Sequence, residues 1–210
     1  MTQPIHDIEA LRAVYGEPSD RARLKQLDRL DQHARRFISM SPFCVVATAS
    51  ADGMVDASPK GDASPKGDAP GFTQVVDDHT LLFPDRPGNN RVDGHMNLMS
   101  NPGIGLLFFI PGLRETLRVN GTAELSTDPA RLQLLTAQGK PPKAALIVSV
   151  REVYMHCGKA MIRSKIWDPA SQIAPGAFPS LGQVLADQID GVDAAQAERD
   201  TEESYREKLY

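Results

Sequence analysis

Apolar positions recur with two different periods along the chain, and these periods separate a β-rich middle from helical ends. Two β-prone runs flank Asp52-Gly53, which predicts a hairpin. Residues 104–110 are apolar almost throughout, as expected for a strand that is covered on both faces. Residues 116–125 alternate instead, so one face of that strand would be apolar and the other, with Thr116 and Arg118, would be polar.

The longest β-like run covers residues 144–157. Its alternation changes phase near Arg151, which predicts a bulge or bend at that point. A shorter apolar run at residues 80–83 stops at a loop rich in Pro, Asp, Gly and Asn, after which apolar residues from Val92 to Met99 follow helical spacing. This segment is therefore predicted to form a strand, a tight loop and a helix.

Helical spacing dominates both ends of the chain. Residues 7–15 predict a short helix, and Ser19 is a candidate N-cap for a longer helix that contains Leu24, Leu27 and Leu30 and ends by Ser41-Pro42. Near the C-terminus, residues 181–189 predict an amphipathic helix. We expect it to pack either on the β-rich part or on a second subunit.

Composition narrows the classes of function. The formal net charge of -4 and the pI of about 5.7 give no electrostatic reason to expect nucleic acid. The longest apolar run, residues 104–110, is too short to span a bilayer. The two cysteines, Cys44 and Cys157, lie in apolar runs, where a buried thiol behaves as a small hydrophobe, and they make no disulfide framework. These features favour a reduced, cytoplasmic protein.

The strand-loop-helix segment at residues 80–99 is the first candidate binding site. Backbone N–H groups at the start of a helix, with Arg86 and Arg91 close in sequence, suit a phosphate. The alternative is an ordinary connecting loop whose arginines are solvated.

A tandem repeat is the second candidate. Residues 56–61, Asp-Ala-Ser-Pro-Lys-Gly, are repeated identically at residues 62–67. Each copy offers a hydroxyl and a cation, Ser58 with Lys60 or Ser64 with Lys66. These groups fit a phosphate or a polar ring edge as well as they fit a solvated loop.

The third candidate follows the longest β-like run. If residues 158–167 are helical, Lys159, Arg163 and Trp167 share one face. A basic and aromatic face suits a flat heteroaromatic cofactor that carries a phosphate. The alternative is a solvated helix face on which Trp167 is buried for packing.

Together these segments resemble the pyridoxamine 5'-phosphate oxidase-like flavoproteins, in a subgroup of FMN-dependent enzymes. The resemblance lies in the order and spacing of Ser-Pro-Lys-Gly, Pro-Asp-Arg-Pro-Gly-Asn-Asn-Arg with Asn97 downstream, and His-Cys-Gly-Lys-Ala-Met-Ile-Arg-Ser-Lys-Ile-Trp-Asp-Pro at residues 156–169. Pro111-Gly and Leu-Arg-Val-Asn-Gly at residues 117–121 add to it. It covers nearly the whole chain.

The resemblance implies a mainly β fold with flanking helices, a six-stranded antiparallel split β-barrel, in a homodimer with FMN at the subunit interface. Residues 1–40 would be N-terminal helices that pack on the barrel, residues 41–168 the FMN-binding barrel, and residues 169–210 a helical tail. The residues that it places at the cofactor are Ser58, Pro59, Lys60, Arg86, Asn89, Asn90, Arg91, Thr116, Arg118, Lys159, Arg163, Ser164 and Trp167.

The resemblance expects one Ser-Pro-Lys-Gly unit, whereas this chain has two. We favour the first copy, because the hairpin before it fixes strand register more firmly than a loop does.

The leading hypothesis for function is an FMN-dependent oxidoreductase with a small-molecule substrate or electron donor. No catalytic acid or base and no metal-ligand spacing is evident, and the cluster that grips substrate phosphate in true pyridoxamine phosphate oxidases is not matched. The alternatives are a non-enzymatic flavin-binding or sensor protein, and a split barrel that binds deazaflavin or haem, for which His156 offers an imidazole.

Overall fold

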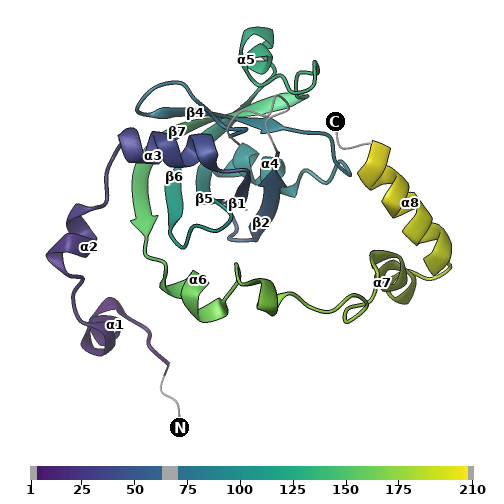
Figure 1. The fold of residues 1–210 in the computed structure, drawn as a ribbon. Coiled ribbons are helices and arrows are strands. Elements are labelled where there is room, and N and C mark those ends of the chain that lie inside the picture. Colours follow the sequence, from purple (N-terminus) through teal and green to yellow (C-terminus); the bar gives the residue numbers. More distant parts are fainter. Residues whose placement is uncertain (1–3, 63–70, 208–210) are drawn as a thin grey trace.

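The computed structural model describes residues 4–62 and 71–207. Its centre is an open antiparallel sheet with the strand order β2-β1-β5-β6-β7-β4-β3 (Figure 1). The strands are β1 Phe43–Ala49, β2 Val55–Gly61, β3 Gln74–Val75, β4 Thr80–Asp85, β5 Gly103–Phe109, β6 Thr116–Ser126 and β7 Ala144–His156. The sheet has seven strands and not the predicted six, because the two-residue β3 pairs with the outer edge of β4.

The sheet curls into a split β-barrel. Strand β2 forms one edge, and side chains at its end reach the end of β4, although the two strands do not pair with each other. The predicted hairpin at Asp52-Gly53 joins β1 to β2, and Gly53 adopts a φ of 87°, in the left-handed region that glycine tolerates. The fold class expected from the sequence is therefore confirmed.

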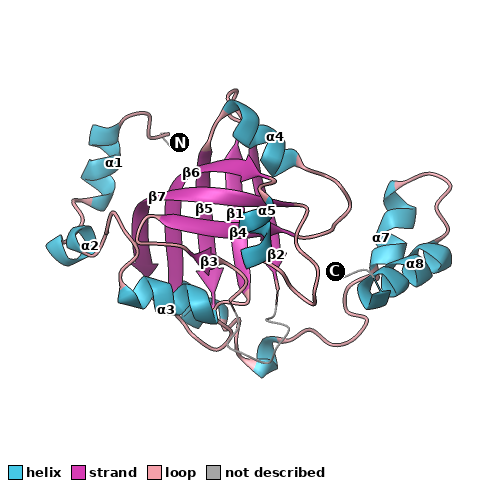
Figure 2. Cartoon of the chain, turned by 90° about the horizontal axis from the view of Figure 1, so that it is seen from above, coloured by secondary structure: helices cyan, strands magenta, loops and turns pink. Residues whose placement is uncertain are grey.

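Helices flank the sheet and extend beyond it on two sides (Figure 2). They are α1 Ile8–Tyr15, α2 Asp20–Leu24, α3 Gln32–Met40, α4 Asp93–Ser100, α5 Pro129–Leu134, α6 Lys159–Ser164, α7 Leu181–Gln188 and α8 Ala194–Glu207, with a 3-10 turn at Pro169–Ser171. The pair α1 and α2 and the pair α7 and α8 stand away from the sheet on opposite sides. No helix in the described ranges is both long and apolar enough to cross a membrane.

The predicted long helix after Ser19 is wrong. Ser19 does cap α2, but the helix ends at Leu24, and Leu27 is extended. The backbone of Leu27 exchanges two hydrogen bonds with Val153 on β7, at 3.0 and 2.8 Å. The side chain of Asp31 then caps a separate helix, α3. Pairing with β7 therefore overrides the helical spacing of the leucines.

The core fills the concave side of the sheet. Its most buried side chains include Leu106 and Phe108 on β5 and Val119 on β6, all at 0% exposure. The apolar face of α3, which carries Phe37 and Ile38, covers one end of this core. On β5 buried positions alternate with half-buried ones, so only one of the two faces predicted to be covered is fully buried in the single chain.

The predicted bulge lies at Arg151. Asn120 of β6 pairs with Glu152, but Gly121 pairs with Val150, so Arg151 has no partner across the ladder. A Cβ atom on Gly121 would lie 2.1 Å from the backbone oxygen of Ser149. The bulge therefore depends on glycine at this position because the opposite strand approaches so closely.

Replacing Gly121 by alanine is expected to destabilise the protein by about 1–3 kcal/mol, because one of two bonded strands must move. Gly88→Ala is the matched control, since a Cβ there meets nothing within 4 Å. Urea unfolding of both variants measures the difference. Equal stability of the two variants would contradict the assignment of the bulge to a steric requirement for glycine.

Candidate functional site

Polar side chains of β2 face the interior of the barrel at its open edge. Ser58 and Lys60 lie opposite Val46 and Cys44 of β1, and so point to the same face as these core residues. Pro59 points to the outer face instead. The predicted set of Ser58, Pro59 and Lys60 is therefore divided between the two sides of the sheet, because successive strand residues alternate.

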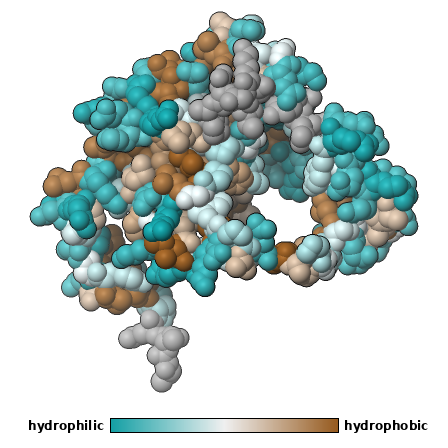
Figure 3. Space-filling view, in the orientation of Figure 1, coloured by the Kyte–Doolittle hydropathy of each residue, from teal (hydrophilic) through white to brown (hydrophobic). Residues whose placement is uncertain are grey.

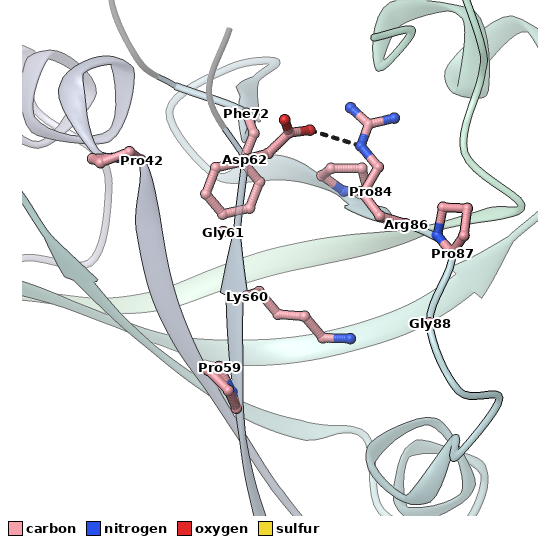
Figure 4. A pocket seen from close by; sticks show the side chains of 10 residues that line it. All are labelled: Pro42, Pro59, Lys60, Gly61, Asp62, Phe72, Pro84, Arg86, Pro87 and Gly88. Carbon is pink, nitrogen blue, oxygen red and sulfur yellow. Dashed lines mark hydrogen bonds and ion pairs between the residues drawn. The ribbon is translucent and has the colours of Figure 1, made fainter. Parts of the chain in front are cut away.

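Two ion pairs join β2 to the end of β4 across this edge. Arg86 Nε lies 2.8 Å from Asp62 Oδ2, and the two side chains are 16% and 3% exposed (Figure 4). Lys60 Nζ lies 3.7 Å from Asp85 Oδ1, and both side chains are partly exposed. We call these four residues the seam cluster.

A cavity of about 600 Å³ opens beside the seam cluster. Figure 4 shows Lys60 and Arg86 among its lining side chains, with Phe72 and four prolines around them. Ligand pockets commonly enclose about 300–1,000 Å³, so this cavity is large enough for a drug-sized or nucleotide-sized ligand. Its two cations are each paired with a carboxylate, Lys60 with Asp85 and Arg86 with Asp62, so an anionic ligand would compete with these partners.

A second, much smaller cavity of about 40 Å³ lies between β2 and α4. Ser58, Lys60, Arg91 and His95 line it. This cavity is far smaller than the one beside the seam cluster and is too small for a nucleotide-sized ligand. His95 Nε2 is 3.6 Å from Asp85 Oδ1, which extends the seam cluster towards α4.

The loop before α4 places Asn89, Asn90 and Arg91 at the surface. Asn89 accepts a hydrogen bond from the Arg91 backbone N–H at 3.0 Å, and Asn90 accepts one from Lys143 Nζ at 3.3 Å. The Arg91 guanidinium is 76% exposed and contacts Asp93 through Nε and Nη2, at 3.0 and 2.8 Å. An incoming phosphate would therefore compete with Asp93 for this arginine.

A second basic cluster lies on the outer face of β6 and β7. It consists of Arg118, Asn120, Glu152 and Tyr154 with Lys25, and we call it the outer cluster. Arg118 donates to Glu152 at 2.6 Å, and Asn120 donates to the same oxygen at 3.0 Å. Lys25 Nζ and the Arg118 guanidinium lie 4.2 and 5.1 Å from the centre of the Tyr154 ring. These contacts confirm that Arg118 points away from the apolar face of its strand.

Thr116 and His156 pair across β6 and β7 at the end of the outer cluster. The His156 ring packs against Tyr154, with 5.0 Å between the ring centres. Partial burial, together with the charges of Arg118 and Lys25, lowers the pKa of His156. The neutral form of the imidazole is therefore favoured relative to that of a solvated histidine.

The predicted face of Lys159, Arg163 and Trp167 does not form. Helix α6 ends at Ser164, and Lys165 is left-handed with a φ of 53°, so Trp167 lies beyond the helix. Its indole Nε1 donates to the backbone oxygen of Leu113 at 2.8 Å, and the side chain is 37% exposed. Ser164 donates to the Met161 oxygen within α6 at 3.2 Å.

The two cysteines have different environments. Cys44 is buried, and burial raises the pKa of its thiol well above its usual range. Cys157 is exposed, contrary to the prediction of a buried thiol, because it lies just beyond the end of β7. A hydrogen bond from the backbone N–H of Lys159 is the main cause of the lowered pKa of the Cys157 thiol.

Several residues of these clusters were missed by sequence reasoning. Asp62 and Asp85 belong to the seam cluster, which His95 extends, and Glu152 and Tyr154 belong to the outer cluster. A signal was present on β7, where Glu152 and Tyr154 share the polar side of the strand after the bulge. Nothing in the sequence spacing indicated that Asp62 and Arg86 would meet.

Comparison with known proteins assigns these elements to a family. Residues 30–157 match the family model described as pyridoxamine 5'-phosphate oxidase. This range is more than half of the 210 residues, and it contains α3 and all seven strands of the sheet. No curated protein sequence matches the chain.

The chain is also similar to several solved structures. HupZ of Group A Streptococcus is 23% identical with a TM-score of 0.46, over 60% of this chain and 92% of HupZ. A general stress protein 26-related protein of the pyridoxinephosphate oxidase family from Clostridium acetobutylicum is 18% identical, with a TM-score of 0.42, over 60% and 86%. HutZ, the heme storage protein of Vibrio cholerae, is 13% identical with a TM-score of 0.37, over 61% and 94%.

Replacing Arg86 by methionine is expected to lower the free energy of unfolding by about 3 kcal/mol, because the guanidinium beside a 3%-exposed carboxylate is lost. Arg23→Met is the matched control. Arg23 also pairs with an aspartate, at 2.6 Å, but both side chains are largely exposed, so about 0.5 kcal/mol or less is expected. Urea unfolding at neutral pH tests this, and similar losses for the two variants would contradict it.

The lowered pKa of His156 predicts a loss of stability as the pH falls. Below its unfolded-state pKa of about 6.5 the unfolded chain binds a proton that the folded chain does not, so acid favours unfolding. His156→Asn should remove this pH-dependent contribution, so that the free energy of unfolding changes less between neutral and mildly acidic pH. Urea unfolding across that range checks it, with His33→Asn as control, and parallel curves for wild type and His156→Asn would refute the assignment.

Proposed function

We propose that this chain, which belongs to the pyridoxamine 5'-phosphate oxidase family, is a cytoplasmic FMN-dependent oxidoreductase that works as a homodimer. The observation that carries the proposal is the division of basic groups into two clusters on opposite faces of the sheet. A second copy would bring the seam cluster of one subunit near the outer cluster of the other. FMN would lie between them, at the subunit interface.

The residues present fit such a cofactor. One terminal nitrogen of Arg118 donates a hydrogen bond to Glu152, but the Arg118 Nε is buried and has no acceptor among the described residues. An unsatisfied buried N–H costs about 1–3 kcal/mol, and an acceptor atom of a ligand would remove that cost. The cavity at the seam has the volume and the cations that a phosphate-bearing ligand needs.

FMN, when bound, supplies the redox chemistry, because its ring accepts and donates hydride or electrons. In this proposal Lys60 and Arg118 place positive charge beside the ring and stabilise the negative charge that reduction brings. Asp85 and Glu152 hold these two side chains in position. Arg86 and Arg91, with Asn89 and Asn90, would bind the phosphate end.

The helix α6 would approach the cofactor from the end of the barrel. Lys159 and Arg163 provide its cations, and Ser164 provides a hydroxyl at the last turn. Trp167 lies beyond the helix and is still partly exposed, so it would contact the cofactor from the turn that follows. Its fluorescence then offers a measure of binding.

The first copy of the repeat is the one that we assign to the cofactor. Ser58 and Lys60 are fixed in strand register by their pairing with β1. Of the second copy, residues 62–67, the structure describes Asp62, and Ser64 and Lys66 lie outside the described residues. The regular register of β2 supports the choice of Ser58 and Lys60.

The purified protein is expected to absorb at about 450 nm, or to do so after FMN is added and the excess removed. Lys60→Met and Arg118→Met should each weaken FMN binding by about tenfold or more, because each removes a charged partner. Arg131→Met, on the exposed face of α5, is the control and should leave the affinity unchanged. Quenching of Trp167 emission gives the dissociation constants.

The outcomes of this titration separate the candidate functions. Absence of flavin absorbance and of quenching would exclude FMN, and a strong band near about 400 nm on adding haem would favour a haem protein. Tight FMN binding without oxidation of NADH or NADPH and without reaction with oxygen would indicate a flavin-binding protein that is not an enzyme.

A further inference from the structure

Asp85, at the end of β4, is shared by two side chains that can carry positive charge. Its Oδ1 lies 3.7 Å from Lys60 Nζ and 3.6 Å from His95 Nε2. Both distances exceed the limit of about 3.2 Å for an N–H···O hydrogen bond. The other ion pair of the seam cluster, between Asp62 and Arg86, is hydrogen-bonded at 2.8 Å. The Asp85 carboxylate, in contrast, lies between two partners and is bonded to neither, so it can move towards either of them.

Helix α4 holds His95 in this position. Asn97 Nδ2 donates a hydrogen bond to Thr48 Oγ1 at 3.0 Å, which joins the helix to β1, and Leu98 is buried in the core. The side chains of His95 and Asp85 are 18% and 19% exposed. Charges that are largely removed from water interact more strongly than charges at the surface. A proton on His95 would therefore act directly on Asp85.

The other charged side chains near His95 have partners of their own. Asp56 and Arg91 line the same small cavity as His95. Asp56 accepts a hydrogen bond from a hydroxyl of its own strand, and Arg91 donates two to Asp93. Within the described residues, the ion-pair contact of His95 is with Asp85. Protonation of the imidazole is therefore expected to affect Asp85 first.

The charge of His95 changes what Lys60 can bind. When the imidazole is neutral, the charges of Lys60 and Asp85 cancel, and an anion that approaches Lys60 competes with Asp85. When the imidazole is protonated, Asp85 has a second cation beside it, and the three side chains together carry one positive charge. Lys60 lines both the small cavity and the large one, so an anion in the large cavity is attracted by this added charge.

Solvent reaches this side of the protein. Figure 3 shows an opening between the body of the protein and the helices α7 and α8, and Figure 1 shows that the edge strand β2 faces this side. The Lys60 side chain is 36% exposed. The seam can therefore exchange small anions and protons with the surrounding water.

We propose that His95 is a positioning residue of the seam: when protonated it draws Asp85 away from Lys60, and Lys60 then binds an anionic ligand more tightly. The inference rests on the proposed function, in which an anionic cofactor occupies the cavity beside Lys60, and it adds a regulation of that site by pH. The coupling is reciprocal, because protonation that favours binding is itself favoured by binding. The protein therefore takes up a proton when the anion binds.

The test uses sulfate as the probe, because its charge stays constant between about pH 8 and about pH 5.5, the range in which histidine titrates. Isothermal titration calorimetry of the full chain should give an affinity about fivefold or more higher at the lower pH. His95→Gln should remove this difference. Asp85→Asn should raise the affinity at the higher pH, because Lys60 loses its competing carboxylate. His79→Gln, at an exposed histidine that precedes the other end of β4, is the control and should behave as the wild type.

The pH profile separates this role from a merely structural one. If His95 only supports the fold, His95→Gln lowers the sulfate affinity by the same factor at both pH values, and that result overturns the inference. A wild-type affinity that does not rise at the lower pH, or no binding of sulfate at either pH, also overturns it. Circular dichroism checks that each variant retains its fold.

FMN affinity, measured on the same samples, tests the cofactor separately. A chain that does not bind FMN, but whose sulfate affinity depends on His95 as expected, overturns the cofactor and supports the role of His95. Binding of FMN with the same pH profile in the wild type and in His95→Gln overturns the role of His95 and leaves the cofactor proposal standing.

Discussion

The buried ion pair between Asp62 and Arg86 sets the shape of the open edge of the barrel. Strand β2 lacks a partner on its outer side within the described structure, so no ladder of backbone hydrogen bonds holds it near β4. The ion pair, at 2.8 Å and largely removed from water, makes that connection through side chains. Removing one partner of a buried ion pair leaves an uncompensated charge, which costs more free energy than burying the intact pair. The pair therefore fixes the separation of β2 and β4, and with it the width of the cavity beside them.

The polarity of the seam follows from this arrangement. A closed barrel would have required apolar residues at the interior positions of β2, but an open one admits Ser58 and Lys60 there. These groups find partners in Asp56 and Asp85. A polar interior edge is consequently available for a ligand without exposing the core, which lies deeper, around Phe108 and Val119.

The outer face of the same sheet has a different distribution of polar and apolar side chains. At β1 and β2 it is apolar, and across β6 and β7 it becomes basic and aromatic around Tyr154. The bulge at Arg151 contributes directly, because the shift in register after Val150 turns Glu152 and Tyr154 towards Arg118. An apolar surface next to a fixed cationic cluster suits association of subunits around an anionic, aromatic ligand, which is the arrangement proposed above.

The sequence by itself determined the hairpin at Asp52-Gly53, the alternation of β6, the bulge at Arg151 and the cap at Ser19, because each depends on near neighbours in the chain. It also marked the basic residues of the candidate site. Only the tertiary structure decided that Leu27 leaves the helix to pair with Val153, and that Asp62 meets Arg86. These contacts join segments that are far apart in sequence. Their free energies outweigh the local preference for helix or loop, and no local sequence pattern indicates that the contacts form.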